Sequence, residues 1–222
     1  MGLAHSPSIV IDNLVLCLDA ANTKSYPSSG GSTWYDVSGK KNDCGISGAT
    51  YNSDGYFDFD GSNDYVNRLN TSLVSNGGGT LECWFNSDDL SSDGTFINHS
   101  GFAYWNLIVR GYDDKIRLEY KSTSSNNTQL LSSSTISNGN WYHVVGVVND
   151  TGARIYINGE LDSSNSTPQN LGTVSSHIYI GHYGTSSYEF DGKIAVVKRY
   201  NKPLTAAEVK QNFNALRGRY GI

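Results

Sequence analysis

Charged side chains are scarce in this sequence: Asp, Glu, Lys and Arg together make up 17% of its 222 residues. The formal net charge is −5, and no stretch concentrates the lysine and arginine that binding to nucleic-acid phosphates requires. No apolar run approaches the roughly 20 residues of a membrane-spanning helix. We therefore expect no nucleic-acid partner and no insertion into a membrane.

Cysteine is also rare, and its three copies, Cys17, Cys44 and Cys83, lack the spacing of metal ligands. Cys17 and Cys83 lie in strand-like runs, where a free cysteine behaves as a small apolar residue. The opening segment, residues 1–7, has neither the basic nor the apolar region of a secretory signal. These features favour reduced thiols and synthesis in a reducing cytosol.

Glycine, by contrast, is abundant with 24 copies, and short apolar runs alternate with polar turns. The clearest example is residues 140–161, where two apolar runs flank a short polar connection. Ile155 and Ile157 alternate with polar neighbours, and the pair Asn158 and Gly159 readily accepts the positive φ of a tight turn. This pattern predicts antiparallel strands with one face in a core and one face outward.

Strand-like segments continue to residue 200 without a linker or a change in composition, so we expect a single domain over residues 1–222. The expected fold class is all-β, a sandwich of two antiparallel sheets with a short C-terminal helix. Residues 1–12 are expected to form an N-terminal arm. The positions expected in the core are Leu16, Leu18, Leu81, Phe85, Ile155, Ile157, Ile178, Ile180 and Ile194.

The C-terminal helix is expected over residues 204–217, followed by a tail at 218–222. Thr205 and Glu208 have the spacing of a capping box, which begins a helix. One apolar stripe should lie on the sandwich, formed by Val209, Phe213 and Leu216.

A resemblance to a known family rests on four segments in order: residues 56–66, 80–85, 141–161 and 178–194. They resemble the laminin-G-like and pentraxin-like branch of the concanavalin A-like jelly-roll lectins. The resemblance spans most of the chain. It implies a jelly roll of two antiparallel sheets and a family whose members often bind glycans, sometimes through calcium.

The two ends of the chain carry a narrower resemblance. Residues 1–3, 8–10 and 14–22, together with residues 211–222, look like virion structural proteins of tailed phages of marine cyanobacteria. This resemblance implies a domain that decorates a capsid or sits on a tail fibre. It rests on analogy of sequence, and fold alone does not fix function.

Glycan binding in such folds combines an aromatic platform with hydrogen bonds from Asn and Asp. The candidate platform residues are aromatic and lie in or beside polar loops: Tyr104, Trp105, Tyr112, Tyr183 and Tyr188. The alternative is that these rings pack in the core, because many aromatic residues of a sandwich do.

Calcium is the candidate cofactor, because loop carboxylates and amide oxygens are its usual ligands. One acidic turn offers such oxygens, from Asp58, Asp60, Asn63 and Asp64. It matches no dedicated calcium-loop pattern, so carboxylates that only shape a solvated turn are the alternative.

An enzyme is not expected. A retaining glycoside hydrolase needs two carboxylates about 5 Å apart on one face. The glutamates of this chain are far apart in sequence. Asp58 and Asp60 share one face of a strand, but Asp60 precedes Gly61 and is better explained as a turn former.

The ends of the chain are candidate assembly contacts. Two basic residues can meet carboxylates of a partner, and two apolar side chains can anchor it: Arg217, Arg219, Tyr220 and Ile222. The alternative is a pair of frayed ends on a monomer.

The function expected from these features is a non-enzymatic phage virion surface protein, a capsid decoration protein or a tail or fibre adhesin. Its lectin-like domain would have host-surface glycans as candidate ligands, and its protein partners would be other virion proteins and copies of itself. It would be assembled in the host cytoplasm and displayed on the virion surface. A free-standing or secreted carbohydrate-binding lectin is the alternative, and a glycan hydrolase is a minor one.

Overall fold

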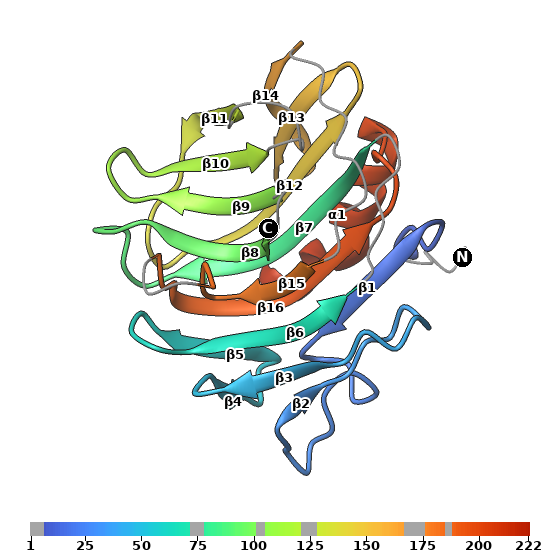
Figure 1. The fold of residues 1–222 in the computed structure, drawn as a ribbon, viewed down its shortest axis with the longest axis vertical. Helices are drawn as coiled ribbons and strands as arrows, with labels where there is room; N and C mark the ends of the chain where they lie inside the picture. Colours follow the sequence, from blue (N-terminus) through green and yellow to red (C-terminus); the bar gives the residue numbers. More distant parts are fainter. Residues whose placement is uncertain (1–6, 72–77, 101–104, 121–127, 167–175, 185–187) are drawn as a thin grey trace, which may run out of the picture.

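A computed structural model describes residues 7–71, 78–100, 105–120, 128–166, 176–184 and 188–222. Two antiparallel sheets stack face to face, and a C-terminal helix lies on the outside (Figure 1). The all-β sandwich that the sequence predicts is therefore confirmed. Among the residues described, no helix is both long and apolar enough to span a membrane.

The first sheet, sheet A, contains β1 (Leu14–Asp19), β4 (Thr50–Asn52), β5 (Tyr56–Asp60), β7 (Gly78–Ser87), β12 (Trp141–Asn149), β13 (Gly152–Ile157), β14 (Glu160–Asn165) and β16 (Asp191–Tyr200). Its order is β14-β13-β12-β7-β16-β5-β4, and β1 pairs with β16. The second sheet, sheet B, contains β2 (Thr33–Trp34), β3 (Cys44–Ser47), β6 (Tyr65–Thr71), β8 (Gly94–Ser100), β9 (Trp105–Arg110), β10 (Lys115–Tyr120), β11 (Thr128–Thr135) and β15 (Ser176–Ile180). Its order is β11-β10-β9-β8-β15-β6-β3-β2.

The predicted hairpin is formed by β12 and β13, which pair from Asn149 opposite Gly152 to Val144 opposite Ile157. Asn158 and Gly159 then make the turn into β14 with φ values of 51° and 79°. A β-carbon on Gly159 would lie 2.8 Å from the Phe213 ring, so this turn also needs the small residue for space.

The core lies between the sheets, as the alternation of apolar residues predicts. Of the nine positions expected inside, eight are fully buried. The exception is Ile157, which is only partly buried and packs against the edge of the core. It is the last residue of β13, where the chain leaves the sheet for the turn.

The three cysteines are buried and unpaired, as expected. Burial raises the pKa of the thiols of Cys17 and Cys44 to about 12. They are therefore neutral, poorly nucleophilic core residues.

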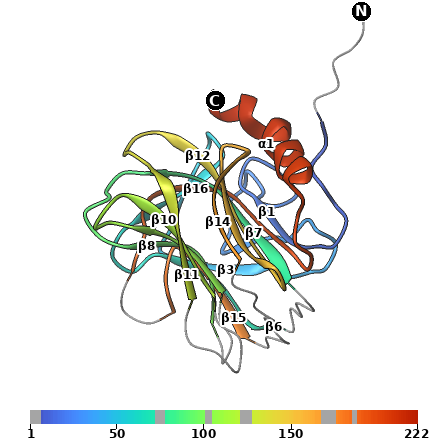
Figure 2. The same ribbon diagram turned by 90° about the horizontal axis from the view of Figure 1, so that it is seen from above.

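The helix α1 (Ala206–Tyr220) begins with the predicted capping box of Thr205 and Glu208, and Gly221 caps its end with φ 73°. It covers the face of sheet A that points away from sheet B (Figure 2). The expected boundary at residue 217 and the expected tail at 218–222 are wrong, because the helix continues for three more residues. Its last residue, Tyr220, stacks on Trp84 with ring centroids 4.4 Å apart.

The expected N-terminal arm is also shorter than predicted. Residues 1–6 lie outside the described part, but Val10 is buried beside the helix. Its N–H donates to Asn212 Oδ1 at 2.7 Å, and its carbonyl accepts from the Tyr200 hydroxyl at 3.0 Å. The segment before β1 therefore belongs to the folded domain.

A buried carboxylate joins the sheet to the helix. Glu82 Oε1 accepts from Lys198 Nζ at 2.6 Å, and Oε2 accepts from Asn212 Nδ2 at 2.7 Å. His143 Nε2 lies 3.1 Å from Oε1. Burial alone would raise the pKa of Glu82, but the Lys198 ammonium and His143 outweigh it and hold the pKa at about 2. Burial lowers the pKa of His143 in spite of the carboxylate.

These pKa shifts make stability depend on pH. The folded-state pKa of each group lies below its ordinary value, 4.5 for Glu82 and 6.5 for His143. The unfolded chain therefore binds more protons, so we expect the contribution of His143 to the free energy of unfolding to fall below pH 6.5. The contribution of Glu82 should fall below pH 4.5. Denaturant unfolding across this range measures both.

The variant His143→Gln keeps an N–H beside Glu82 but has no proton to gain. We expect its stability curve to lack the loss that begins at pH 6.5 and to keep the loss below pH 4.5. Parallel curves for the variant and the unaltered protein would contradict a buried, neutral His143.

Candidate functional site

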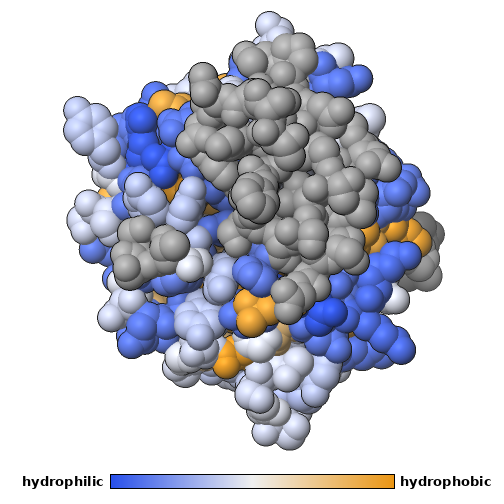
Figure 3. Space-filling view, in the orientation of Figure 1, coloured by the Kyte–Doolittle hydropathy of each residue, from blue (hydrophilic) through white to orange (hydrophobic). Residues whose placement is uncertain are grey.

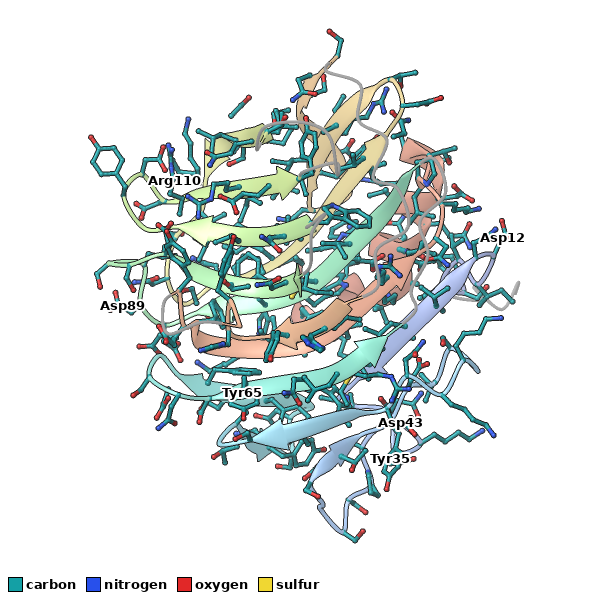
Figure 4. The ribbon with its side chains drawn as sticks, in the orientation of Figure 1. Asp12, Tyr35, Asp43, Tyr65, Asp89 and Arg110 are labelled. Atoms are coloured by element: carbon teal, nitrogen blue, oxygen red, sulfur yellow. The ribbon has the colours of Figure 1, made fainter. Side chains whose placement is uncertain are left out.

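The outer face of sheet B is its side that points away from sheet A. Along β10, Ile116, Leu118 and Tyr120 enter the core, so Arg117 and Glu119 point outward. Figure 3 looks onto this face, and hydrophilic residues gather at its upper left, over the β9–β10 turn. In Figure 4 the labels Arg110, Asp89 and Tyr65 mark one end of the sandwich, and Asp12 and Asp43 mark the other.

A row of hydrogen-bonding side chains crosses this outer face at right angles to the strands. The strand registers place one such residue on each of six neighbouring strands, from β11 through β10, β9, β8 and β15 to β6. We call this set the polar row: Gln129, Glu119, Asn106, Asn98, Tyr179 and Asn67. Neighbouring members are about 4.8 Å apart along the row, which is the spacing of strands in a sheet.

Glu119 is the centre of contacts within the polar row. Its Oε2 accepts from the Tyr183 hydroxyl at 3.3 Å and from Asn106 Nδ2 at 3.4 Å. Its Oε1 accepts from Gln129 Nε2 at 3.2 Å. Donors on both sides therefore fix the carboxylate in position.

Arg117 lies two residues before Glu119 on β10, on the same face of the strand. It connects Glu119 to Asp93, the residue just before β8. Its Nη2 is 2.9 Å from Asp93 Oδ2, and its Nε is 3.2 Å from Glu119 Oε1. The guanidinium also lies 5.6 Å from the centroid of the Tyr188 ring. The cation is thus held between two carboxylates and an aromatic ring.

Tyr183 and Tyr188 form an aromatic pair beside the polar row. Their ring centroids are 5.3 Å apart at an interplanar angle of 69°. The Tyr183 carbonyl accepts from Asn98 Nδ2, and the Tyr188 carbonyl accepts from the Thr95 N–H at 3.0 Å. Two backbone contacts with β8 therefore place both rings on the outer face, and Tyr188 remains 38% exposed.

Two buried polar atoms at β8 have no hydrogen-bond partner in the described protein. They are Oδ1 of Asn98, a member of the polar row, and Oγ1 of Thr95. Both side chains are at most 1% exposed. A buried polar group without a partner costs about 1–3 kcal/mol, so these two atoms are free to accept a further hydrogen bond.

The structure separates the five aromatic residues that the sequence suggests for glycan binding. Tyr183 and Tyr188 come together on the outer face, whereas Tyr112 stands alone at the β9–β10 turn, 92% exposed. Trp105 is only 2% exposed and belongs to the core, so its ring cannot serve as a surface platform. Tyr104 lies outside the described residues.

Sequence reasoning missed the polar side chains that surround the tyrosine pair: Asn98, Asn106, Arg117, Glu119 and Gln129. One local signal was available. Residues 115–120 alternate charged and apolar side chains, which places Arg117 and Glu119 on one face of a strand. The asparagines gave no such signal, because only the register between strands brings them to Glu119.

The turn with the candidate calcium ligands is stabilised by its own backbone. Asp60 Oδ1 accepts from the N–H groups of Ser62 and Asn63, and Asp64 Oδ2 accepts from the Asp60 N–H at 3.1 Å. Partial burial and the charges of Asp60 and Asp58 raise the pKa of Asp64 despite that bond. In the part of the chain that the structure describes, no three Asp, Glu, His or Cys residues lie close enough to share a metal ion.

Two of the candidate assembly residues contact other side chains of the domain, and the other two are exposed. Arg219 Nη1 is 2.7 Å from Asp19 Oδ1, and Tyr220 stacks on Trp84 within the domain. Arg217 and Ile222 are exposed at the end of α1.

The turn geometry leads to a test of the calcium hypothesis. Because the turn carboxylates already bond backbone N–H groups, we expect a chelator to leave the melting temperature unchanged and added calcium not to raise it. A ligand that binds only the folded state would raise the melting temperature by linkage. Stabilisation by calcium that is lost in Asp60→Asn would contradict this expectation.

Comparisons with known proteins agree with the fold. A family model described as concanavalin A-like lectin/glucanases superfamily matches residues 60–210. No curated protein matches the sequence. Among solved structures, the binding domain of Paraclostridial Mosquitocidal Protein 1 is similar at a TM-score of 0.73 and 18% identity, over 92% of this chain and 52% of that one.

Two further solved structures carry sugars or sugar analogues in their descriptions. The ligand-binding domain of botulinum neurotoxin serotype D, in complex with N-acetylneuraminic acid, has a TM-score of 0.70 at 18% identity, over 92% of this chain and 51% of that one. Trypanosoma rangeli sialidase in complex with 2,3-difluorosialic acid has a TM-score of 0.69 at 19% identity, over 93% and 33%. The chain thus spans about half or less of these structures, and at these identities they show the fold alone.

The family model covers well over half of the chain, and the sandwich has the architecture that this family shares. The chain belongs to the concanavalin A-like lectin/glucanases superfamily.

Proposed function

We propose that this chain is a non-enzymatic carbohydrate-binding domain and that the polar row is its binding surface. The observation that carries the proposal is the polar row itself. Oδ1 of Asn98, a member of the row, and Oγ1 of the nearby Thr95 are buried without a hydrogen-bond partner. Sugar hydroxyls both donate and accept hydrogen bonds. They therefore suit a surface that offers amide, carboxylate and phenol groups together.

The aromatic pair supplies the other half of such a site. A sugar ring has apolar C–H faces, which stack on exposed aromatic rings, and Tyr188 is the more exposed of the two tyrosines. Its carbonyl is held by Thr95, so the ring is positioned before a ligand arrives. Such a preformed platform lowers the entropy cost of binding.

The arrangement of the row also suits a chain of sugars. Its six members span five strand intervals, or roughly 24 Å at about 4.8 Å each. An extended oligosaccharide lying across the strands would meet Gln129, Tyr179 and Asn67, because Glu119, Asn106 and Asn98 are buried. The superfamily supports carbohydrate as the ligand class.

The charges of the site favour binding without hydrolysis. A glycosidase needs one carboxyl group to hold a proton and a second one to act on the sugar. Here Asp93 lies 2.9 Å from the Arg117 guanidinium, and both oxygens of Glu119 accept hydrogen bonds from neighbouring side chains. Neither is arranged as a free acid or nucleophile facing a ligand.

Titration calorimetry with oligosaccharides tests the proposal. We expect Tyr188→Ala to weaken binding about tenfold, equivalent to about 1.4 kcal/mol, because the platform is lost. The matched control is Tyr112→Ala, which removes the same side chain from the far tip of the β9–β10 turn. It should bind as the unaltered protein does.

The same preparations show whether the domain is catalytic. Incubation with β-glucans, galactans and cyanobacterial polysaccharide should release no reducing ends above background. Turnover that disappears in Glu119→Gln would overturn the non-enzymatic proposal. Equal weakening by the two tyrosine variants would overturn the polar row as the binding surface.

We further propose that the domain is displayed on a phage virion, as capsid decoration or as a tail or fibre adhesin, after assembly in the host cytoplasm. The resemblance of the two chain ends to virion proteins is the support. Residues 8–10 and α1 lie on the outside of sheet A, and the polar row lies on the opposite side of the sandwich (Figure 2). Attachment through the helix side to virion proteins or further copies would leave the row free for host-surface glycans.

Particle incorporation tests this display. Tyr220 packs within the fold, so the test changes exposed residues in and just after the last turn of α1. We expect Arg217→Glu with Ile222→Asp to keep the melting temperature and reduce incorporation. Tyr35→Asp is the control, because it also exposes a new carboxylate at an exposed apolar position away from the helix (Figure 4). Normal incorporation of the double variant would show that the end of α1 is not the attachment surface.

A further inference from the structure

Arg117 is the cation closest to the centre of the polar row, and two carboxylates of the protein already lie beside it. Asp93 contacts Nη2 and Glu119 contacts Nε, so carboxylates occupy two sides of the planar guanidinium. Tyr188 lies over the group at 5.6 Å. An incoming anion would meet a cation that already lies within 3.2 Å of two carboxylates.

Of the two other cations on this side of β9 and β10, Arg110 is paired with Asp113, and Lys115 lies near the same carboxylate. Arg110 Nε donates to Asp113 Oδ1 at 2.7 Å, and its Nη2 contacts the other oxygen of the same carboxylate. Lys115 lies near enough to Asp113 to lower the pKa of that carboxyl group, after the larger effect of the bonds from Arg110. Each of the described cations on this part of the face therefore has a carboxylate beside it.

We propose that the polar row selects neutral glycans and rejects glycans that carry carboxylate groups. This inference rests on the proposed function and names the class of ligand for that same surface. A sugar carboxylate placed at Arg117 would displace Asp93 or Glu119 and lie next to the one that remains. Like charges in close contact at a partly buried site are strongly unfavourable. Neutral hydroxyl groups carry no such cost and match the amides of Asn98 and Asn106.

The ligand-side experiment compares three probes that share configuration and length and differ in the group at C6, of which one is charged. They are a neutral hexose oligosaccharide, the uronic-acid oligosaccharide of the same configuration and length, and the methyl ester of that uronic acid. We expect the unaltered protein to bind the neutral probe and the methyl ester, and to bind the uronic acid at least about tenfold more weakly. This comparison needs no variant protein.

The protein-side experiment uses Asp93→Asn. The amide oxygen of asparagine can still accept from the Gly111 N–H, which Asp93 Oδ1 accepts at 3.0 Å, but the charge on Arg117 is no longer balanced there. We expect the variant to gain about tenfold in affinity for the uronic acid and to keep its affinity for the neutral probe. Asp54→Asn is the matched control, because it removes the same charge at an exposed turn between β4 and β5.

The outcomes separate this inference from the function on which it rests. Equal affinity for the neutral and the acidic probe would leave carbohydrate binding in place and overturn the selection. An identical gain in Asp54→Asn and Asp93→Asn would assign the effect to net charge and also overturn it. Failure of all three probes to bind would overturn both the proposed function and the inference.

Discussion

The buried carboxylate of Glu82 is the interaction on which one whole side of the molecule depends. Glu82 lies on β7, and its carboxylate accepts hydrogen bonds from Lys198 of β16 and Asn212 of α1. His143 of β12 lies beside the same carboxylate. Removing one member of such a buried set leaves an uncompensated charge, at a cost of roughly 3–5 kcal/mol. The same asparagine also holds the backbone of Val10. One carboxylate therefore aligns three strands, the helix and the segment before β1.

This arrangement gives the two outer faces of the sandwich different cover. On the outside of sheet A, aromatic rings of the sheet and of α1 stack closely, as Trp84 does with Phe213 and Tyr220. The outside of sheet B has no helix over it in the described residues, and it carries amides and charges together with tyrosine rings. The two faces are built from the same alternation along strands. They differ in what lies over them: the helix packs on the outside of sheet A.

The sequence predicts the fold well because its signals are local. Alternation in Arg154–Ile157 and the turn at Asn158 need only a few residues each, and both appear in the structure. The helix extends beyond the expected end at residue 217, because the stacking of Tyr220 on Trp84 stabilises its last turn through Gly218. Tertiary packing here outweighs the low helix propensity of glycine.

The candidate site could be predicted only in part, because it depends on register. Tyr183 and Tyr188 were found from their polar surroundings, but Trp105, also taken from its place in the chain, faces the core. Asn98, Asn106 and Glu119 become neighbours only when β8, β9 and β10 pair as they do, and a shift of one residue would turn each side chain into the core. The charges show the same dependence. The sequence does not show that Arg117 will lie between two carboxylates, because Glu119 is on its own strand but Asp93 comes from the segment before β8.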